Sequence, residues 1–106
     1  MNTKNILQEF KERLEMVYKD NLKEVILFGS MARGEFTEES DMDVLVVLDN
    51  IANHEDEFNK VFQIAREIEK KHDDKIIISS TLATQNDYNT RLEPLYLNVG
   101  REGITL

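Results

Sequence analysis

The feature that most constrains the fold is the apolar run from Met42 to Leu48, MDVLVVL. The run is continuous rather than alternating and is rich in β-branched residues, which predicts a strand buried on both faces. Such a strand requires packed elements on each side of its sheet. A β-rich run at residues 23–28 predicts a strand before it, and Lys75–Leu82 (KIIISSTL) predicts a third strand after it.

Apolar residues at helical spacing predict helices around these strands. The first helix is expected over residues 3–18 and the second over residues 53–71. A third helical segment is expected over residues 84–100, with a break near Pro94, before a short edge strand at residues 104–106. The expected apolar faces are Leu7, Phe10, Leu14 and Val17 in the first helix, and Phe58, Val61, Phe62, Ala65 and Ile68 in the second.

The order of these elements predicts the fold class α/β (α+β), a small mixed β-sheet with helices packed on it. A chain of 106 residues is long enough for one modest core, so residues 1–106 are expected to form a single domain. The sequence leaves the oligomeric state open, and assembly into an oligomer is compatible with it.

Charge and composition exclude several classes of function. The chain carries 13 basic and 21 acidic residues, a net charge of −8, and such a surface repels a polynucleotide backbone. Direct nucleic-acid binding is therefore not expected. The chain has no cysteine, and no run approaches the roughly 20 apolar residues that span a bilayer. We expect no membrane association and a soluble, cytoplasmic protein.

Two acidic residues, Asp41 and Asp43, stand at the start of the central apolar run. Residues two apart on a strand point to the same face of the sheet, so both carboxylates can converge on a divalent cation, typically Mg²⁺. A pair of such ions can stabilise the attacking and leaving oxygens of a phosphoryl displacement. A lone Asp-x-Asp is more often a solvated strand end, but the apolar residues that follow fix this pair on a rigid element.

The turn after the first expected strand contains Gly29 and Ser30. A glycine lets the backbone approach a ligand closely, and successive amides at the start of a helical turn can hold an anion. Ser30 adds a hydroxyl donor. By itself the pair is more typical of an ordinary strand-to-turn connection. Arg33 is suited either to pairing with a phosphate or to bracing the loop.

The combined pattern is more specific than its parts. Gly29-Ser30, ten residues and then Asp41-Met42-Asp43 resembles the G-S-x10-D-x-D motif of the DNA polymerase β-like nucleotidyltransferase superfamily. More narrowly, FGSMARGEFTEESDMDVLVV resembles the GSxARG…SDxD form of the minimal nucleotidyltransferase (MNT) proteins, and the ending LNVGREGITL is also similar to these short proteins.

The resemblance implies a nucleotidyltransferase fold in which Gly29, Ser30 and Arg33 bind the nucleotide phosphates. Asp41 and Asp43 would be the catalytic residues and would bind Mg²⁺, with two ions expected. It also implies transfer of a nucleoside monophosphate, most often AMP from ATP, to a hydroxyl group. Many MNT proteins are antitoxins to HEPN-domain ribonuclease toxins, so the resemblance implies a HEPN toxin as partner.

The sequence departs from the family pattern at one position. Active members usually carry a third carboxylate on the strand that corresponds to Lys75–Leu82, and this run has none. Asp74 lies just ahead of it and is the candidate third acid. The alternatives are a site that works with two acids, or a catalytically weak or inactive binding module that neutralises its partner by contact. Transfer to a small molecule is less favoured, because it usually requires a second domain.

Overall fold

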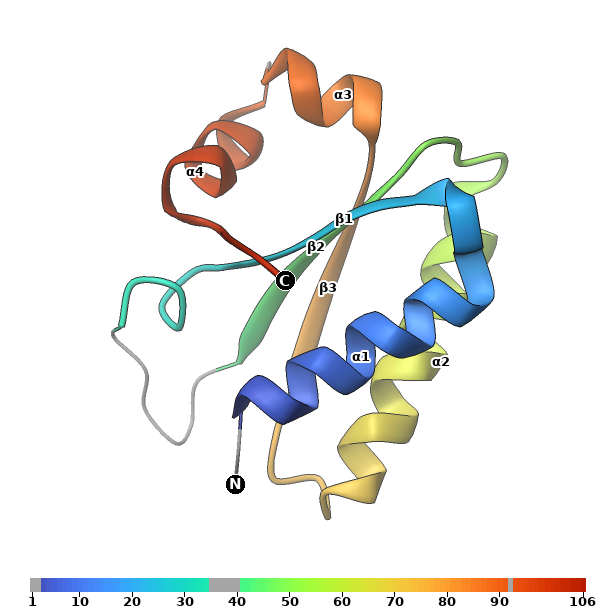
Figure 1. The fold of residues 1–106 in the computed structure, drawn as a ribbon, viewed down its shortest axis with the longest axis vertical. Helices are drawn as coiled ribbons and strands as arrows, with labels where there is room; N and C mark the ends of the chain where they lie inside the picture. Colours follow the sequence, from blue (N-terminus) through green and yellow to red (C-terminus); the bar gives the residue numbers. More distant parts are fainter. Residues whose placement is uncertain (1–2, 35–40, 92) are drawn as a thin grey trace.

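The computed structural model describes residues 3–34, 41–91 and 93–106 of the chain. Four strands, β1 (Leu22–Phe28), β2 (Met42–Leu48), β3 (Ile78–Thr84) and β4 (Ile104–Thr105), form one sheet in the order β3-β2-β1-β4 (Figure 1). β1 is antiparallel to both β2 and β4, whereas β2 and β3 are parallel. The sheet is therefore mixed, and the expected fold class is confirmed.

Helices cover both faces of this sheet (Figure 1). α1 (Thr3–Tyr18) and α2 (His54–Lys71) pack on one face, and α3 (Gln85–Thr90) and α4 (Pro94–Glu102) pack on the other. A single 3₁₀ turn, η1 (Lys19–Asn21), joins α1 to β1. None of the helices in the described ranges is long and apolar enough to cross a membrane.

The central strand β2 is buried on both sides, as its sequence predicts. Val44, Val46 and Leu48 pack in the core under α1 and α2. Leu45 and Val47 pack on the opposite side, in a smaller core with Tyr88 and Tyr96, whose rings meet edge to face with centroids 6.0 Å apart. All five of these β2 residues are fully buried. β2 is thus a rigid support for the two aspartates at its start.

β3 lies further along the chain than predicted. The expected strand was Lys75–Leu82, whereas the observed strand is Ile78–Thr84. The length of β3 is set by its neighbour, because Met42 pairs with Ile78 and Leu48 pairs with Thr84. Thr84 closes the strand and also caps α3, its hydroxyl accepting a hydrogen bond from the Asp87 amide at 3.2 Å.

Three apolar residues that were expected on buried helix faces are exposed instead. Val17 of α1 is half exposed, and Phe58 and Phe62 of α2 are 36% and 51% exposed. The buried stripe of α2 is centred on other residues, Val61, Ile64, Ala65 and Ile68, which leaves both phenylalanines at its margin. Their rings stack on each other with centroids 6.2 Å apart, beside His54.

The outer edge of β3 is tied to α2 by a buried carboxylate. Glu69 is only 4% exposed and accepts a hydrogen bond from the Ile78 amide at 2.8 Å. Arg66, one turn earlier in α2, donates to the same carboxylate at 2.7 Å. On an edge strand, the backbone amides that point away from the sheet have no acceptor in a neighbouring strand and need another one. Glu69 supplies this acceptor for the Ile78 amide.

Removing this carboxylate is expected to destabilise the protein. We predict that Glu69→Ala lowers the free energy of unfolding by about 2 kcal/mol, because it leaves the Ile78 amide without its acceptor. Glu67→Ala, which removes an exposed ion pair with Arg13, is the matched control and is expected to lower stability much less. Urea denaturation of both variants measures the difference, and equal midpoints would contradict the prediction.

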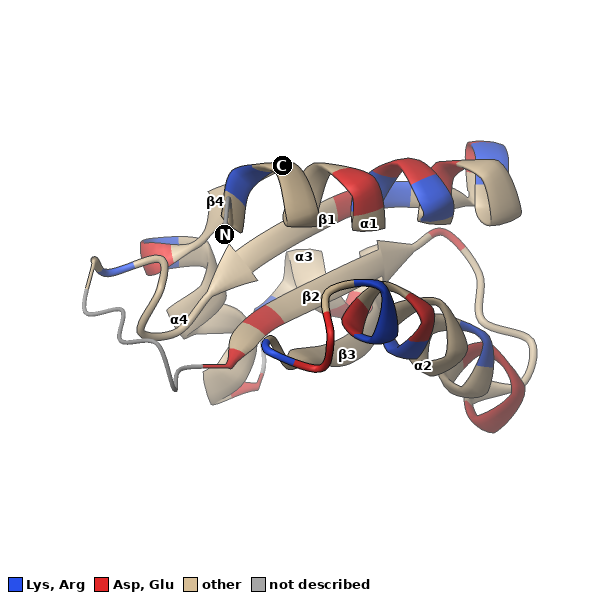
Figure 2. Cartoon of the chain, turned by 90° about the horizontal axis from the view of Figure 1, so that it is seen from below, with Lys and Arg blue, Asp and Glu red and all other residues tan. Residues whose placement is uncertain are grey.

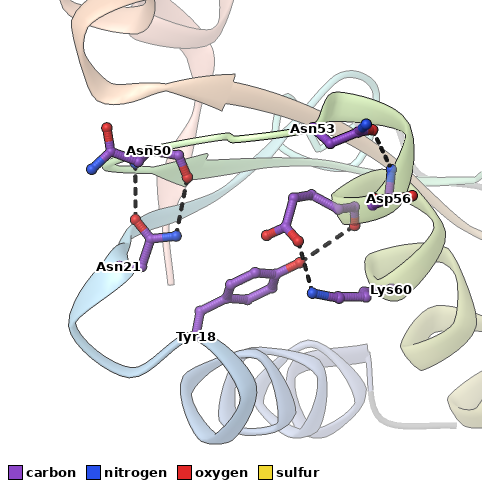
Figure 3. A network of polar contacts seen from close by, with 7 residues as sticks. Tyr18, Asn21, Asn50, Asn53, Asp56 and Lys60 are labelled. Carbon is purple, nitrogen blue, oxygen red and sulfur yellow. Dashed lines mark hydrogen bonds and ion pairs between the residues drawn. The ribbon is translucent and has the colours of Figure 1, made fainter.

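A second polar network lies at the end of the sheet opposite to Asp41, where β1 begins and β2 ends (Figure 3). The Asn21 side chain donates to the Asn50 carbonyl at 3.1 Å and accepts from the Asn50 amide at 2.9 Å. Nearby, the Tyr18 hydroxyl donates to the Glu57 carbonyl at 3.3 Å. Burial, with the negative charge of Glu57, raises the pKa of Tyr18 to about 12. These contacts join α1, α2 and the strands at the opposite end from the two aspartates.

Candidate active site

The turn that follows β1 lies directly against the start of β2. Gly29 has a φ of +77°, a conformation that side-chain-bearing residues rarely adopt. A Cβ atom at this position would overlap the carboxylate oxygen Oδ2 of Asp43. Glycine is therefore required here for two reasons, its backbone conformation and the close approach of the Asp43 carboxylate.

Residues 29–34 form a hydrogen-bonded turn, where the sequence predicts a turn over residues 29–33. The Arg33 amide donates to the Gly29 carbonyl at 3.2 Å, and the Gly34 amide donates to the Met31 carbonyl at 3.2 Å. Ser30 is the first residue inside this turn. The first amides of a helical turn have no acceptor within the turn and are suited to an anion. The Gly29-Ser30 amides and the Ser30 hydroxyl therefore remain the predicted phosphate-binding groups.

Asp41 immediately precedes β2, and Asp43 is the second residue of the strand. Figure 2 shows acidic residues at this end of β2. Asp41 is exposed just ahead of the strand, and Asp43 is half buried and paired with Phe28 of β1. Burial and the negative charge of Asp41 raise the pKa of Asp43, and the positive charge of Arg33 opposes this rise. The two carboxylates therefore repel each other.

Arg33 connects this site to the C-terminal part of the chain. Its guanidinium forms an ion pair with Glu102 at the end of α4, at 3.0 Å, and acts electrostatically on Asp43. The ion pair with Glu102 supports the interpretation that Arg33 braces the turn, and pairing of Arg33 with a phosphate stays a prediction. Glu102 was not singled out from the sequence, because 69 residues separate it from Arg33.

The structure does not bring Asp74 into this group. Asp74 lies in the turn after α2, where its carboxylate is paired with Arg66 at 3.3 Å and is mostly exposed. On β3 the residue level with Asp43 is Ser79. Within residues 3–34, 41–91 and 93–106, no three acidic or histidine side chains are grouped closely enough to hold a metal ion together.

The residues present are compatible with a magnesium site in which the protein supplies only some of the ligands. Mg²⁺ is commonly held by one or two carboxylates together with waters and substrate phosphates. Asp41 and Asp43 supply two carboxylates on one strand end, and a cation between them would relieve the repulsion that raises the pKa of Asp43. The turn that is predicted to bind phosphate lies beside them, so a bound nucleotide could supply the remaining ligands.

Comparison with known sequences agrees with this arrangement. Residues 3–93 match the sequence family described as the nucleotidyltransferase domain. The chain belongs to this family. Among relatives of this nucleotidyltransferase, one protein of Methanocaldococcus jannaschii, provisionally named protein adenylyltransferase MJ0604, is 32% identical over 107 residues, covering 100% of this chain and 99% of the relative. A second from the same organism, provisionally named protein adenylyltransferase MJ0141, is 39% identical over 82 residues, covering 74% of this chain and 82% of the relative.

Solved structures share the fold of this nucleotidyltransferase. A protein from Sulfolobus solfataricus, provisionally described as a nucleotidyltransferase, superposes with a TM-score of 0.65 at 20% identity, covering 95% of this chain and 76% of the other. A chain of a toxin–antitoxin complex crystallised with AMP-PNP gives a TM-score of 0.60 at 18% identity, covering 98% of this chain and 72% of the other. At these identities the similarity establishes the fold.

Proposed function

We propose that this nucleotidyltransferase transfers AMP from ATP to a hydroxyl group of a protein partner, and that the partner is a HEPN-domain toxin which the transfer silences. The observation that carries the proposal is the contact between the Gly29 turn and the Asp43 carboxylate. This contact joins a phosphate-binding turn to an acidic pair. Support also comes from relatives named as protein adenylyltransferases and from the fold shared with a toxin–antitoxin chain.

In the proposed reaction, the acceptor hydroxyl oxygen forms a bond to the α-phosphorus of ATP. The bond between this phosphorus and the oxygen that bridges to the β-phosphate breaks, and pyrophosphate leaves. The hydroxyl proton passes to solvent, and the acceptor becomes an AMP ester. Because the protein makes no covalent bond, its contribution is to position the reactants and to stabilise negative charge.

Each site residue has a proposed part in this reaction. The amides of the turn and the Ser30 hydroxyl donate hydrogen bonds to the triphosphate, and Arg33 offsets part of its charge. Asp41 and Asp43 would hold Mg²⁺, with two ions expected. Bound Mg²⁺ would supply charge neutralisation at the phosphoryl oxygens. Gly29 keeps the turn close enough for both sets of groups to reach one nucleotide.

A second candidate function is a binding module that neutralises its partner by contact alone. The observation that favours it is the lack of a third carboxylate beside Asp41 and Asp43 within the described part of the chain. The two functions differ in one respect that can be measured. Only the transferase requires the acidic pair in order to act on its partner.

Calorimetric titration of the full chain with ATP, with and without Mg²⁺, tests the proposed function. We expect binding that requires Mg²⁺ and weakens at least about tenfold when AMP replaces ATP, because the β- and γ-phosphates are lost. Incubation with radiolabelled ATP, Mg²⁺ and a co-purified HEPN partner should then label the partner. Absence of ATP binding in both titrations would reject the transferase and favour the contact module.

A further inference from the structure

We infer that a groove along the free edge of β3 receives the acceptor protein as an extended, basic segment and brings its hydroxyl group to the edge of the candidate active site at Asp41. This inference rests on the proposed function and adds to it the surface and the chemistry that select the acceptor. The groove has a volume of about 350 Å³ and lies between β3 and α2. Asp41 lines one part of it, so the groove is continuous with the candidate active site.

The first observation is the unpaired edge. β3 is the outermost strand of the sheet on this side, and no strand within the described ranges pairs with its outer edge. The Ile78 amide on that edge is already bonded to Glu69. The edge that continues beyond Ile78, through Ser80 and Leu82, can accept an added strand. An extended peptide binds such an edge through main-chain hydrogen bonds, and neighbouring pockets select its side chains.

The second observation is the apolar lining of the groove. Phe58 and Phe62 from α2 and Ile77 ahead of β3 all line it, and Phe62 and Ile77 are 51% and 55% exposed. These side chains would pack against alternate side chains of an added strand. Ser80 also lines the groove.

The third observation is the charge of the groove. Among the described residues, its charged lining is Asp41, Glu69 and Arg66. Arg66, the cation of this set, is shared between Glu69 and Asp74, at 2.7 and 3.3 Å, so its charge is already offset by two carboxylates. The chain as a whole carries a net charge of −8. Lysine and arginine on the incoming segment therefore complement the groove, and acidic segments are repelled.

Nuclear magnetic resonance of the ¹⁵N-labelled full chain tests the inference directly. The probe is a pool of end-blocked nonapeptides with a central tyrosine and with lysine, arginine, valine and threonine at the flanking positions. We expect amide shifts that map to the groove between β3 and α2. Two control probes are expected not to bind. In one pool, glutamate and aspartate replace the basic residues. The other is a basic pool that is methylated on alternate backbone amides, which removes main-chain hydrogen-bond donors.

Phe62→Asp is the test variant, because it places a charge in the groove at an exposed position. We expect it to weaken binding of the basic pool about tenfold while its Tm and its affinity for Mg·ATP stay unchanged. Val17→Asp is the matched control, since Val17 is 50% exposed on α1 and does not line the groove. It should bind the pool as the parent chain does.

The outcomes separate this inference from the proposed function. Shifts that map elsewhere, equal binding of acidic and basic pools, or no binding up to the solubility limit of the peptides would overturn the groove while Mg·ATP binding still stands. Binding of the basic pool by a chain that does not bind Mg·ATP would overturn the role of the groove as an acceptor site. The inference is supported if the chain binds Mg·ATP, if the shifts caused by the basic pool map to the groove, and if Phe62→Asp weakens binding of that pool.

Discussion

Replacing Asp41 and Asp43 together by asparagine is expected to abolish Mg²⁺-dependent ATP binding and to lower AMP transfer to the partner by at least about a thousandfold. Asparagine keeps the size of each side chain but removes the negative charge that would hold the cations. Loss of one donor that stabilises developing charge at an acyl-transfer site already costs about 10²–10³ in rate. Two metal ions would stabilise both the attacking and the leaving oxygen, so we expect a larger loss here. Calorimetry with Mg·ATP and transfer of radiolabelled AMP measure the two effects.

The same variant is expected to be more stable than the parent chain in metal-free buffer. The pKa of Asp43 is raised in the folded state, mainly by burial and then by the charge of Asp41. The folded protein therefore holds this proton more tightly than the unfolded chain, and stability falls as the pH rises above 3.8 through the raised pKa. An amide removes this penalty at neutral pH, so we expect Tm to rise by about 2 °C or more.

Three results would contradict this account. Persistent labelling of the partner by the double variant would show that the acidic pair is not catalytic. Loss of partner labelling with full retention of partner neutralisation would favour the contact module, because contact does not need the carboxylates. A fall in Tm in metal-free buffer would mean that the two aspartates stabilise the fold rather than strain it.

Gly29→Ala is expected to weaken Mg·ATP binding about a hundredfold, and Gly34→Ala is expected to leave it nearly unchanged. The two glycines have almost the same φ, +77° and +76°. Each alanine should therefore cost a similar backbone strain, about 1–2 kcal/mol. Only at Gly29 does the added methyl group overlap the Asp43 carboxylate, whereas at Gly34 it meets no described atom within 4 Å.

The comparison of the two alanine variants isolates the contact between the turn and the strand. Urea denaturation should give similar losses of stability, and calorimetry with Mg·ATP should give affinities that differ about a hundredfold. The difference arises because the Asp43 side chain must move to accommodate the methyl group and no longer faces the cation. Equal affinities in the two variants would show that this contact has no part in nucleotide binding.

Much of the fold could be predicted from the sequence because each element carries its own signal. The bounds of β2 coincide with its apolar run, and α1 and α2 match their predicted ranges to within a residue. The bounds of β3 could not be predicted in the same way. Its apolar run begins before the strand, and the ladder to β2 decides where pairing begins and ends. This information lies in the partner strand rather than in the run itself.

The candidate site was predictable to a similar extent. The motif identified Gly29 and the two aspartates, and the structure brings Gly29 and Asp43 into contact. The sequence did not indicate that Glu102 pairs with Arg33, or that Glu69 is buried against the edge of β3. Both are charged residues on helices, and their position alone is typical of a solvated surface. Only the tertiary arrangement gives each of them a specific partner.

The proposed reaction attaches a nucleotide to a hydroxyl group, and this chain carries hydroxyl groups itself. All three tyrosines of this chain are buried, with 5–8% of each residue exposed. The Tyr18 hydroxyl donates a hydrogen bond to the Glu57 carbonyl. Tyr88 of α3 and Tyr96 of α4 pack against each other in the smaller core. Burial also raises the pKa of Tyr18 and of Tyr96, which lowers the reactivity of both phenols. The fold therefore shields the chain's own tyrosines from the proposed transfer, and we expect a tyrosine acceptor to lie on another molecule.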